Sequence, residues 1–578
     1  MFIKRAYILF GSFLLWSGLV WARLFYWQVI NGDKLAAQAI SQTIQIKEVL
    51  PERGRIYTSD KFPIVLNEKN YLFYGWLPEI DTDLELLSEK LAPIIAAGRE
   101  DEDEKDILKE TEKKLNGLFK NERGVKWVCL DKNINEEQKK VILEFGIPGL
   151  SFEEKDGRFY PEGSMAAHLV GFLGQDKMGR QTGYFGLEGF YDRQLKGWGG
   201  VESGSGGILA KLSFLQSGQS GLESKSGRNI HLFINRAAQY IVEEELETAI
   251  TKYGAKSGWI IVLEPETGGI LASAVYPKYD PKNFFQYEAR LYPNPIISEV
   301  FEPGSIIKPL IVAAALEEKV IDTKDKCNIC NGPVTIGEYE IETWNKEYHP
   351  ESTVEEILKH SDNVGMVWIG NKLELDNILK YLRKYGFDRK TTIDLEGEVS
   401  LPLREEKDWY PIDIATSAFG QGIAITPIQM ITAFNALANG GVIVPPRLME
   451  KVSENNNNNI TWQYRPPKGK RIISKETTNL VKEMLISAVN DGEAKWTRLK
   501  NYTVAGKTGT AQIAVRGKYD EEKTIASFIG YAPADNPRFT MLVSLVEPTS
   551  SQWGSETAAP LWFDVTSKLL YLWGVSPH

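Results

Sequence analysis

The stretch PGSIIKPLIVAAALEEKVI, from Pro303 to Ile321, carries most of the fold assignment. It opens with a Pro-Gly turn, places a serine where a helix N-terminus is expected, and continues as an apolar run with a charged end. This pattern predicts a buried helix. Two β-rich runs precede it, SGWIIVLE (Ser257 to Glu264) and GGILASAV (Gly268 to Val275), and the turn-forming residues between them predict a hairpin.

Two further strand-like runs lie near the C-terminus, NYTVAG (Asn501 to Gly506) and RFTMLVSLVE (Arg538 to Glu547). Helical segments therefore stand between early and late strands. This order predicts an α+β domain whose sheet pairs its first and last segments.

Composition narrows the class of protein. A chain of 578 residues exceeds one hydrophobic core, so we expect several domains. Hydrophobic residues at 43% and charged residues at 25% exclude a disordered protein and a polytopic transporter. A net charge of −10 makes a nucleic-acid partner unexpected.

The N-terminus carries an uncharged run of 17 residues, AYILFGSFLLWSGLVWA, from Ala6 to Ala22. As a helix it rises about 26 Å, nearly a bilayer core. The run extends to Val29 if Arg23 reaches toward lipid head groups. We expect an uncleaved transmembrane anchor over residues 6–29, with residues 1–5 cytoplasmic and the rest of the chain outside the cytoplasm. A cleavable signal peptide is the competing interpretation, but no small-x-small cleavage site is visible.

A composition break divides the remaining chain. Residues 199–228 contain eight Gly and seven Ser, which is typical of a linker or a long extended loop. We therefore expect a mixed α/β pedestal domain over residues 43–200, a Gly/Ser-rich linker over 201–228, and the α+β domain over 229–575.

Ser305 and Lys308 form the first chemical motif. Ser305 is the one serine in the chain with a lysine three residues later, and at this spacing on a helix both side chains share a face. A serine hydroxyl becomes a nucleophile when a base takes its proton, and a helix N-terminus offers N–H groups to an oxyanion. A capping serine followed by a surface lysine is the structural alternative.

Two more motifs follow in order. Ser361-Asp362-Asn363 lies at a polar break between two expected helices; another Ser-x-Asn, at Ser453, falls in the Asn-rich loop. Lys-Ser/Thr-Gly occurs at Lys225, Lys256 and Lys507, but only Lys507-Thr508-Gly509 comes after the other two motifs and follows a strand. We expect Lys507 to project from an edge strand beside a cleft, where Gly509 allows a ligand close to the backbone.

The ordered set Ser-x-x-Lys, Ser-Asp-Asn, Lys-Thr-Gly is the signature of penicillin-binding proteins and class A β-lactamases. A serine hydrolase with a histidine base is not supported: the chain has no Gly-x-Ser-x-Gly elbow, and its internal histidines (His168, His231, His349 and His360) stand in no triad context. Lysine is then the expected base.

With these residues in view, the chain resembles a class B penicillin-binding protein of the division type. The matching boxes are RGRI (53–56), YPEGSMAAHLVGFLG (160–174), GYFGLEGFYDRQLKG (183–197), EPGSIIKP (302–309), AFGQGIAITPIQM (418–430), NGG (439–441) and SFIGYAPADNPRF (527–539). TSDK (58–61) departs from the family pattern, which leaves pedestal details open. The resemblance implies a membrane anchor, a pedestal or dimerisation domain, and a transpeptidase domain with a central antiparallel sheet flanked by helices.

The resemblance also implies roles for the motif residues. Ser305 would attack the penultimate D-Ala carbonyl of a peptidoglycan stem peptide and form an acyl-enzyme. Lys308 would be the general base, kept neutral by burial and by the positive charge of Lys507. Ser361 would relay the proton to the leaving amine, and Asn363 would hold the substrate amide.

The remaining motif residues would bind substrate. Lys507, Thr508 and Thr510 would hold the terminal carboxylate beside Gly509, and the N–H groups of Ser305 and Thr510 would form the oxyanion hole.

The implied partners are a peptidoglycan stem on a lipid-linked glycan strand, β-lactams, the membrane, a membrane glycosyltransferase, and divisome or elongasome proteins. No cofactor and no metal are expected.

A septal role is favoured by GYFGLEGFYDRQLKG (183–197), with lateral-wall synthesis as the alternative. A β-lactamase, a carboxypeptidase and a bifunctional synthase fit the pedestal less well, and a non-catalytic β-lactam sensor or divisome scaffold remains open.

The cysteines leave a choice of interpretation. Cys327 and Cys330, with His349 further on, are compatible with a local disulfide, a pair of free thiols or a zinc site; in an exported domain the first two are simpler. Cys129 is expected to be a small buried residue.

Overall fold

The computed structural model describes residues 2–35, 44–49, 51–97, 104–120, 125–205, 224–455, 459–515 and 518–577. The chain forms two compact units. One contains residues 1–54 and 196–227, and the other contains residues 55–195 and 228–578.

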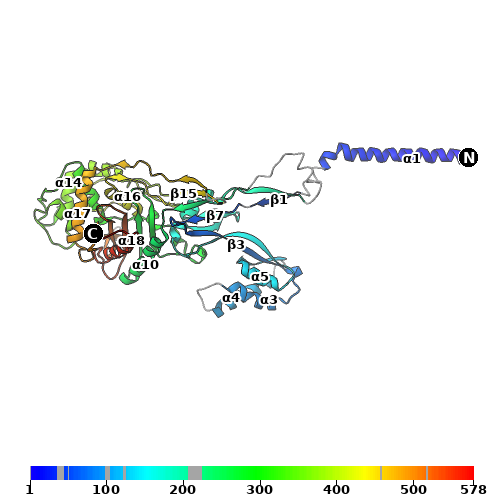
Figure 1. The fold of residues 1–578 in the computed structure, drawn as a ribbon, viewed down its shortest axis with the longest axis horizontal. Helices are drawn as coiled ribbons and strands as arrows, with labels where there is room; N and C mark the ends of the chain where they lie inside the picture. The colour runs from blue at the N-terminus through cyan, green and yellow to red at the C-terminus, as the bar shows by residue number, and fades with distance from the viewer. Residues whose placement is uncertain are drawn as a thin grey trace. The chain divides into compact units, whose positions relative to one another are not determined.

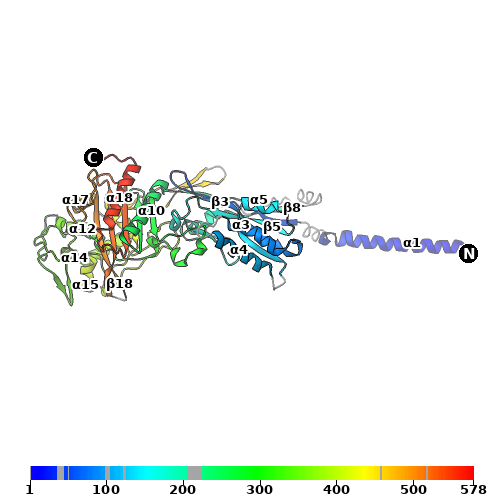
Figure 2. The same cartoon turned by 90° about the horizontal axis from the view of Figure 1, so that it is seen from below.

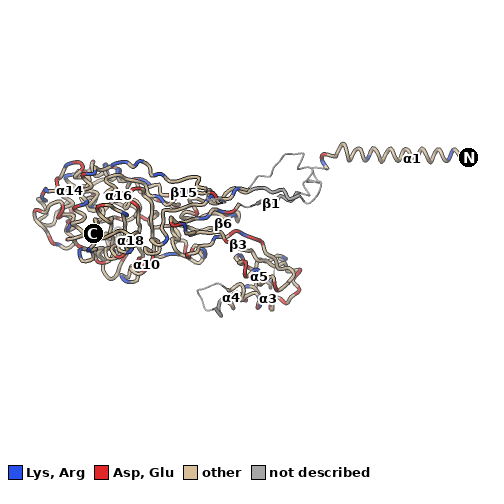
Figure 3. The backbone as a smooth tube through the Cα atoms, in the orientation of Figure 1, with Lys and Arg blue, Asp and Glu red and all other residues tan. Residues whose placement is uncertain are grey.

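The first unit contains the N-terminal helix. α1 (Phe2–Phe25) continues into a π-helical turn, η1 (Tyr26–Ile30). Within the described residues, Phe2–Ile30 is the one helical stretch long and apolar enough to cross a membrane. Figure 3 shows it almost free of charged residues. An N-terminal apolar helix covering the predicted anchor is thus confirmed.

The first unit also contains a two-stranded antiparallel sheet. β1 (Ile44–Val49) pairs with β8 (Gly200–Ser205). The predicted Gly/Ser-rich linker therefore begins with strand residues, while its central part, 206–223, lies outside the described residues.

The pedestal part of the second unit is built on one long strand. β3 (Pro63–Trp76) pairs with β4 (Trp127–Ile134) and with β5 (Leu150–Phe159). Helices α3 (Leu84–Ala96), α4 (Glu104–Phe119) and α5 (Glu136–Glu144) share one apolar core with β3 and β4. Figure 2 shows these helices around the strands. The core contains Phe73, Leu87, Leu91, Leu115 and Ile142.

Residues from both sides of the pedestal join its sheet. β2 (Ile56–Tyr57) pairs in parallel with β9 (Arg228–Leu232), which pairs with β15 (Met449–Glu454). The sheet order is β16-β15-β9-β2-β3-β4, with β5 on β3. Ser453, assigned above to the Asn-rich loop, lies in β15, and its hydroxyl contacts His231 at 3.0 Å. Residues 456–458 of that loop lie outside the described residues.

The central sheet of the α+β domain has five antiparallel strands in the order β11-β10-β20-β19-β18. They are β10 (Ser257–Leu263), β11 (Ile270–Tyr276), β18 (Ala505–Val515), β19 (Lys518–Ala532) and β20 (Phe539–Val546). The hairpin prediction and the pairing of early with late strands are both confirmed, since β10 lies between β11 and β20. β18 is an edge strand, as predicted, but it begins at Ala505. The strand predicted over residues 501–506 is therefore wrong for residues 501–504, and Lys507-Thr508-Gly509 lies inside the strand and not after it.

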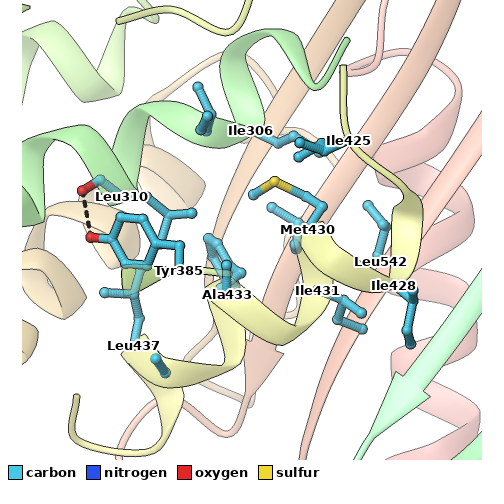
Figure 4. Packing of buried hydrophobic residues seen from close by; sticks show 14 of the residues in the cluster. Ile306, Leu310, Tyr385, Ile425, Ile428, Met430, Ile431, Ala433, Leu437 and Leu542 are labelled. Atoms are coloured by element: carbon cyan, nitrogen blue, oxygen red, sulfur yellow. Dashed lines mark hydrogen bonds between the residues drawn. The ribbon is translucent and has the colours of Figure 1, made fainter. Parts of the chain in front are cut away.

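Helices cover both faces of this sheet. α10 (Arg236–Tyr253) and α18 (Ala558–Leu572) contact each other and share one apolar cluster with strand residues (Figure 1). The other cluster contains α12 (Lys308–Glu317), α14 (Asn363–Lys384), α16 (Pro427–Ala438) and α17 (Lys475–Asp491). Every residue from Lys308 to Leu316 is buried, because α12 is apolar all round. Figure 4 shows Ile306 and Leu310 packed near Met430, Ala433 and Leu437 of α16.

The remaining described elements are short. They are η2 (Leu77–Glu79), α6 (Ala167–Val170), β6 (Phe172–Gln175), β7 (Gln181–Tyr184), α7 (Gly186–Phe190), α8 (Asp192–Lys196), η3 (Phe284–Gln286), η4 (Ala289–Leu291), α11 (Pro295–Ser298), η5 (Gly304–Ile307), β12 (Val334–Ile336), β13 (Tyr339–Ile341), α13 (Val354–Lys359), η6 (Glu406–Asp408), α15 (Pro411–Ser417), β14 (Val442–Ile443), β16 (Ile460–Gln463) and β17 (Lys470–Arg471).

Candidate active site

Ser305 lies in a short 3-10 turn, η5, directly before α12. The turn makes no side-chain cap and Lys308 is buried, so the structural alternative of a capping serine followed by a surface lysine is wrong. The reason is that the chain enters α12 through the tighter 3-10 geometry, in which side chains three residues apart eclipse each other. Ser305 and Lys308 therefore keep the same face, as predicted, and Ser305 is half-buried.

The Lys308 side chain is fully buried and is surrounded by oxygen atoms. Its Nζ donates to the main-chain oxygen of Ser361 at 2.7 Å, to Asn363 Oδ1 at 2.9 Å and to Ser361 Oγ at 3.3 Å. Burial lowers the pKa of Lys308 to about 7, with a second contribution from the positive charge of Lys507. A substantial neutral fraction near pH 7 follows.

The Ser361-Asp362-Asn363 motif is a helix-to-helix junction. The N–H of Asp362 donates to Ile357 O at 2.9 Å and that of Ser361 to Leu358 O at 3.3 Å, the bond pattern that ends a helix with a left-handed residue. Ser361 occupies that position with φ 55°, where glycine is usual. Asp362 then caps α14 by accepting the N–H of Gly365 at 3.1 Å.

Asn363 is the first residue of α14 and links two parts of the site. Its Oδ1 accepts from Lys308, and its Nδ2 donates to Glu342 O at 3.1 Å. The predicted lysine, serine and asparagine are thus brought together by one junction between helices.

The Lys507-Thr508-Gly509 motif lies on the edge strand β18, which packs against the Ser305 turn. A Cβ added to Gly509 would lie 2.7 Å from Ile306 Cγ2, and one added to Gly304 would lie 3.1 Å from Thr510 O. The glycines therefore allow backbone-to-backbone approach at this point. As an edge strand, β18 has alternate backbone N–H groups that do not bond β19.

Lys507 is buried, and burial lowers its pKa. Its Nζ donates to Thr508 O and to Thr508 Oγ1, both at 3.1 Å. The Thr508 hydroxyl in turn donates to Glu493, which leaves it committed to a protein partner. The half-buried Thr510 accepts the N–H of Gly554 at 3.0 Å through its hydroxyl oxygen, so its own hydrogen remains available to a ligand.

Sequence reasoning missed two features of this site. Glu493 lies in the turn after α17, with a carboxylate oxygen 3.8 Å from Lys507 Nζ. Trp344 and Trp553 are in contact, with ring centroids 5.0 Å apart and ring planes tilted by 60°. Trp344 Nε1 donates to His360 O, and Trp553 precedes the Gly554 whose N–H donates to Thr510. None of these residues belongs to a motif with a recognisable spacing, so no local signal predicts them.

The structure shows which of the three interpretations of Cys327 and Cys330 applies. Cys327 and Cys330 form a disulfide, which removes the two thiolates that a zinc ion would need. Across the part of the chain that the structure describes, no group of three or more metal-ligating side chains is found. Cys129 is half-buried and more exposed than predicted. Its neighbours in β4, Val128 and Leu130, face the pedestal core, so Cys129 lies on the opposite face of the strand.

The arrangement suits acyl transfer. It offers a hydroxyl on a tight turn, a buried amine with a low pKa, a second hydroxyl beside that amine, and a second buried lysine on the edge strand β18. These are the parts needed to activate a nucleophile and to hold an anionic substrate.

Comparisons with known families cover most of the chain. Residues 258–567 match the family described as penicillin binding protein transpeptidase domain, and residues 48–232 match the penicillin-binding protein dimerisation domain.

Curated relatives extend over nearly the full length. The chain is 30% identical over 559 residues to stage V sporulation protein D of Bacillus subtilis, covering 96% of this chain and 84% of that protein. It is 28% identical over 586 residues to the probable peptidoglycan D,D-transpeptidase PenA of Neisseria meningitidis, covering 99% and 93%. It is 26% identical over 578 residues to the peptidoglycan D,D-transpeptidase FtsI of Escherichia coli K12, covering 99% and 92%.

Solved structures show the same fold. Penicillin binding protein 3 from Mycobacterium tuberculosis, complexed with aztreonam, gives a TM-score of 0.69 at 22% identity, covering 92% of this chain and 98% of that one. A peptidoglycan synthetase from Bifidobacterium adolescentis gives 0.70 at 22% identity, covering 93% and 98%.

Proposed function

Because the chain belongs to the class B penicillin-binding proteins, with a dimerisation domain and a transpeptidase domain, we propose that it cross-links peptidoglycan stem peptides through an acyl-enzyme on Ser305. Its relatives named as peptidoglycan D,D-transpeptidases support this activity. The observation that carries the residue assignment is the buried Lys308, whose amine contacts both Ser361 and Asn363 and has a pKa of about 7.

In the first step Ser305 Oγ attacks the carbonyl carbon of the penultimate D-Ala, and its proton passes to neutral Lys308. A neutral amine has two N–H donors and one lone pair, so Lys308 can keep its two shorter bonds, to Ser361 O and Asn363 Oδ1, while the lone pair accepts the proton. The oxyanion forms beside the backbone N–H groups of Ser305 and Thr510.

The tetrahedral intermediate then collapses. The carbon–nitrogen bond to the terminal D-Ala breaks, and Ser361 passes a proton from Lys308 to the leaving amine. An ester to Ser305 remains. An amine from a neighbouring stem attacks this ester, the new amide forms, and the proton that the amine loses returns to Ser305 Oγ through the same groups.

Residues of the edge strand β18 bind the substrate in this proposal. We assign the terminal carboxylate to Lys507 and to the hydroxyl of Thr510. Thr508 contributes through its contact with Lys507, since its own hydroxyl donates to Glu493. Asn363 holds the amide of the stem peptide, and Gly509 leaves the backbone accessible. The carboxylate and strained amide of a β-lactam meet the same groups, so β-lactams should acylate Ser305.

The compartment follows from the anchor. We place residues 1–5 in the cytoplasm, residues 6–29 in the membrane and the catalytic domain outside, because Lys4 and Arg5 flank the apolar helix. The Cys327–Cys330 disulfide supports an oxidising compartment. We propose a membrane glycosyltransferase and divisome proteins as its partners in septal wall synthesis, the role favoured by the box at 183–197. Depletion in the source bacterium should block septation, and normal division with altered cell width would point to lateral-wall synthesis.

Turnover of a D-Ala-D-Ala donor separates the enzyme from a β-lactam sensor. The full-length protein in detergent should release D-Ala from the donor in the presence of an acceptor amine, and Ser305→Ala should abolish release. Persistent acylation by penicillin without donor turnover would favour the sensor.

A further inference from the structure

The site holds two buried lysines whose proposed roles need opposite protonation states. Lys308 has to be neutral to accept a proton, whereas Lys507 has to be an ammonium to attract a carboxylate. Both side chains are almost completely buried, and the charge of Lys507 lowers the pKa of Lys308. Two ammonium groups that interact in this way repel each other, so the pair tends to lose one proton. The groups around the two lysines decide which of them keeps the remaining proton.

The carboxylate of Glu493 lies where it stabilises a proton on Lys507. Its carboxylate accepts a hydrogen bond from Thr508 Oγ1, which accepts one from Lys507 Nζ, and the direct distance from Glu493 Oε2 to Lys507 Nζ is 3.8 Å. Within the described residues it is the one carboxylate in ion-pair distance of Lys507, and none lies in that range of Lys308. The negative charge of Glu493 is therefore bound more closely to Lys507 than to Lys308.

The fold fixes Glu493 in this position. Gly492 ends α17, and a Cβ there would lie 2.3 Å from Ala488 O and 2.8 Å from Lys359 O. Lys359 is the last residue of α13, two residues before Ser361. The turn that carries Glu493 is thus packed against the junction that holds Lys308, on one side, and against β18 on the other.

We propose that Glu493 holds the shared proton on Lys507 and so leaves Lys308 free to act as the base. This inference rests on the proposed function of the two lysines. Glu493 acts through Lys507 and Thr508, which makes it a positioning residue. Its charge also raises the pKa of both lysines, opposing burial, and Asp362 is the other carboxylate that acts on Lys308. The Asp362 carboxylate, however, caps α14.

The test is the pH profile of acylation by benzylpenicillin, measured as the second-order rate constant for the full-length protein in detergent. In Glu493→Gln both lysines lose a favourable charge, so both limbs of the bell-shaped profile should move to lower pH. The alkaline limb should move further, by about one pH unit, which is about a tenfold loss of rate at a fixed pH on that limb. The rate below pH 7 should be unchanged or higher.

Asp491→Asn is the matched control, because it removes an exposed carboxylate two residues away and should leave the profile in place. If Glu493→Gln has a much lower melting temperature, Thr508→Val carries the test, since it removes the hydroxyl that joins Glu493 to Lys507 and should shift the alkaline limb in the same direction. A profile that superimposes on the wild type, or that falls by one factor at every pH, overturns the proposal. A wild-type protein that is not acylated on Ser305 contradicts the proposed function instead.

Discussion

Ser361 combines an unfavourable backbone conformation with a contact to the base. Its φ of 55° costs an L-residue about 1–2 kcal/mol relative to glycine, and its hydroxyl lies 3.3 Å from Lys308 Nζ. The helix junction alone would favour glycine at this position. A serine at this position is consistent with the proton relay that we propose for its hydroxyl.

Ser361→Gly and Ser361→Ala separate these two contributions. Both variants should lose about 10²–10⁴-fold in acylation rate, because both lack the proton relay. The glycine variant should be as stable as the wild type or more stable by up to about 1 kcal/mol, once the entropy cost of glycine offsets part of the relief. Acylation kinetics and urea unfolding of the two variants measure this. An acylation rate equal to that of the wild type in either variant would show that Ser361 does not relay the proton.

If Lys308 is the base, as proposed, acylation of the wild-type protein depends on pH with a sign that its lowered pKa sets. Burial lowers its pKa from the ordinary value for lysine to about 7, so the base is present above that pH and is lost as the pH falls. The rate constant for acylation should fall about tenfold per pH unit below 7. Lys308→Arg should have very low activity and should not show this fall in rate below pH 7, because arginine stays protonated throughout this range. A wild-type rate that is flat from pH 5 to 8 would contradict a lysine base.

At the scale of elements, the contact between η5 and β18 sets the distance between Ser305 and the strand to which we assign the substrate carboxylate. Gly509 makes that contact possible, since a Cβ would lie 2.7 Å from Cγ2 of the fully buried Ile306. Gly509→Ala should push the strand and the turn apart, lowering acylation about 10- to 100-fold at a stability cost of about 1–3 kcal/mol. Gly332→Ala is the control, because nothing lies within 4 Å of its added Cβ. Equal acylation by both alanine variants would show that the strand position is not critical.

A buried ion pair joins two elements of the pedestal. Arg158 on β5 and Glu188 on α7 lie 2.8 Å apart, with side chains 2% and 0% exposed. Removing one partner leaves a buried charge, so Glu188→Ala should cost about 3–5 kcal/mol of unfolding free energy. Glu154 also lies on β5 and forms an exposed ion pair with Lys69 on β3, so Glu154→Ala should change stability little. Equilibrium urea unfolding compares the two, and equal midpoints would mean that the buried pair is not needed.

At the scale of the whole molecule, the sequence predicts what depends on local pattern. The apolar helix, the β10–β11 hairpin, the pairing of β10 with β20 and the edge position of β18 each leave a periodic or turn signal. The order of the three motifs predicts which residues share a site, although each motif alone is weak.

What the sequence does not predict is set by tertiary packing. The parallel pairing of β2 with β9 joins segments separated by the whole pedestal, and strands this short have no pattern of their own. Glu493 reaches Lys507 because α17 packs against α13, and the left-handed Ser361 needs a helix junction to hold it. The domain boundaries at residues 200 and 228 stay predictions.

The central claim is that Ser305 is the acylated nucleophile, and peptide mapping of the full-length protein after brief treatment with labelled penicillin tests it most directly. We predict one covalent adduct, on the peptide that contains Ser305, absent in Ser305→Ala and strongly slowed in Lys308→Ala. An adduct on a different residue, or a folded protein that takes up no label, would contradict the account.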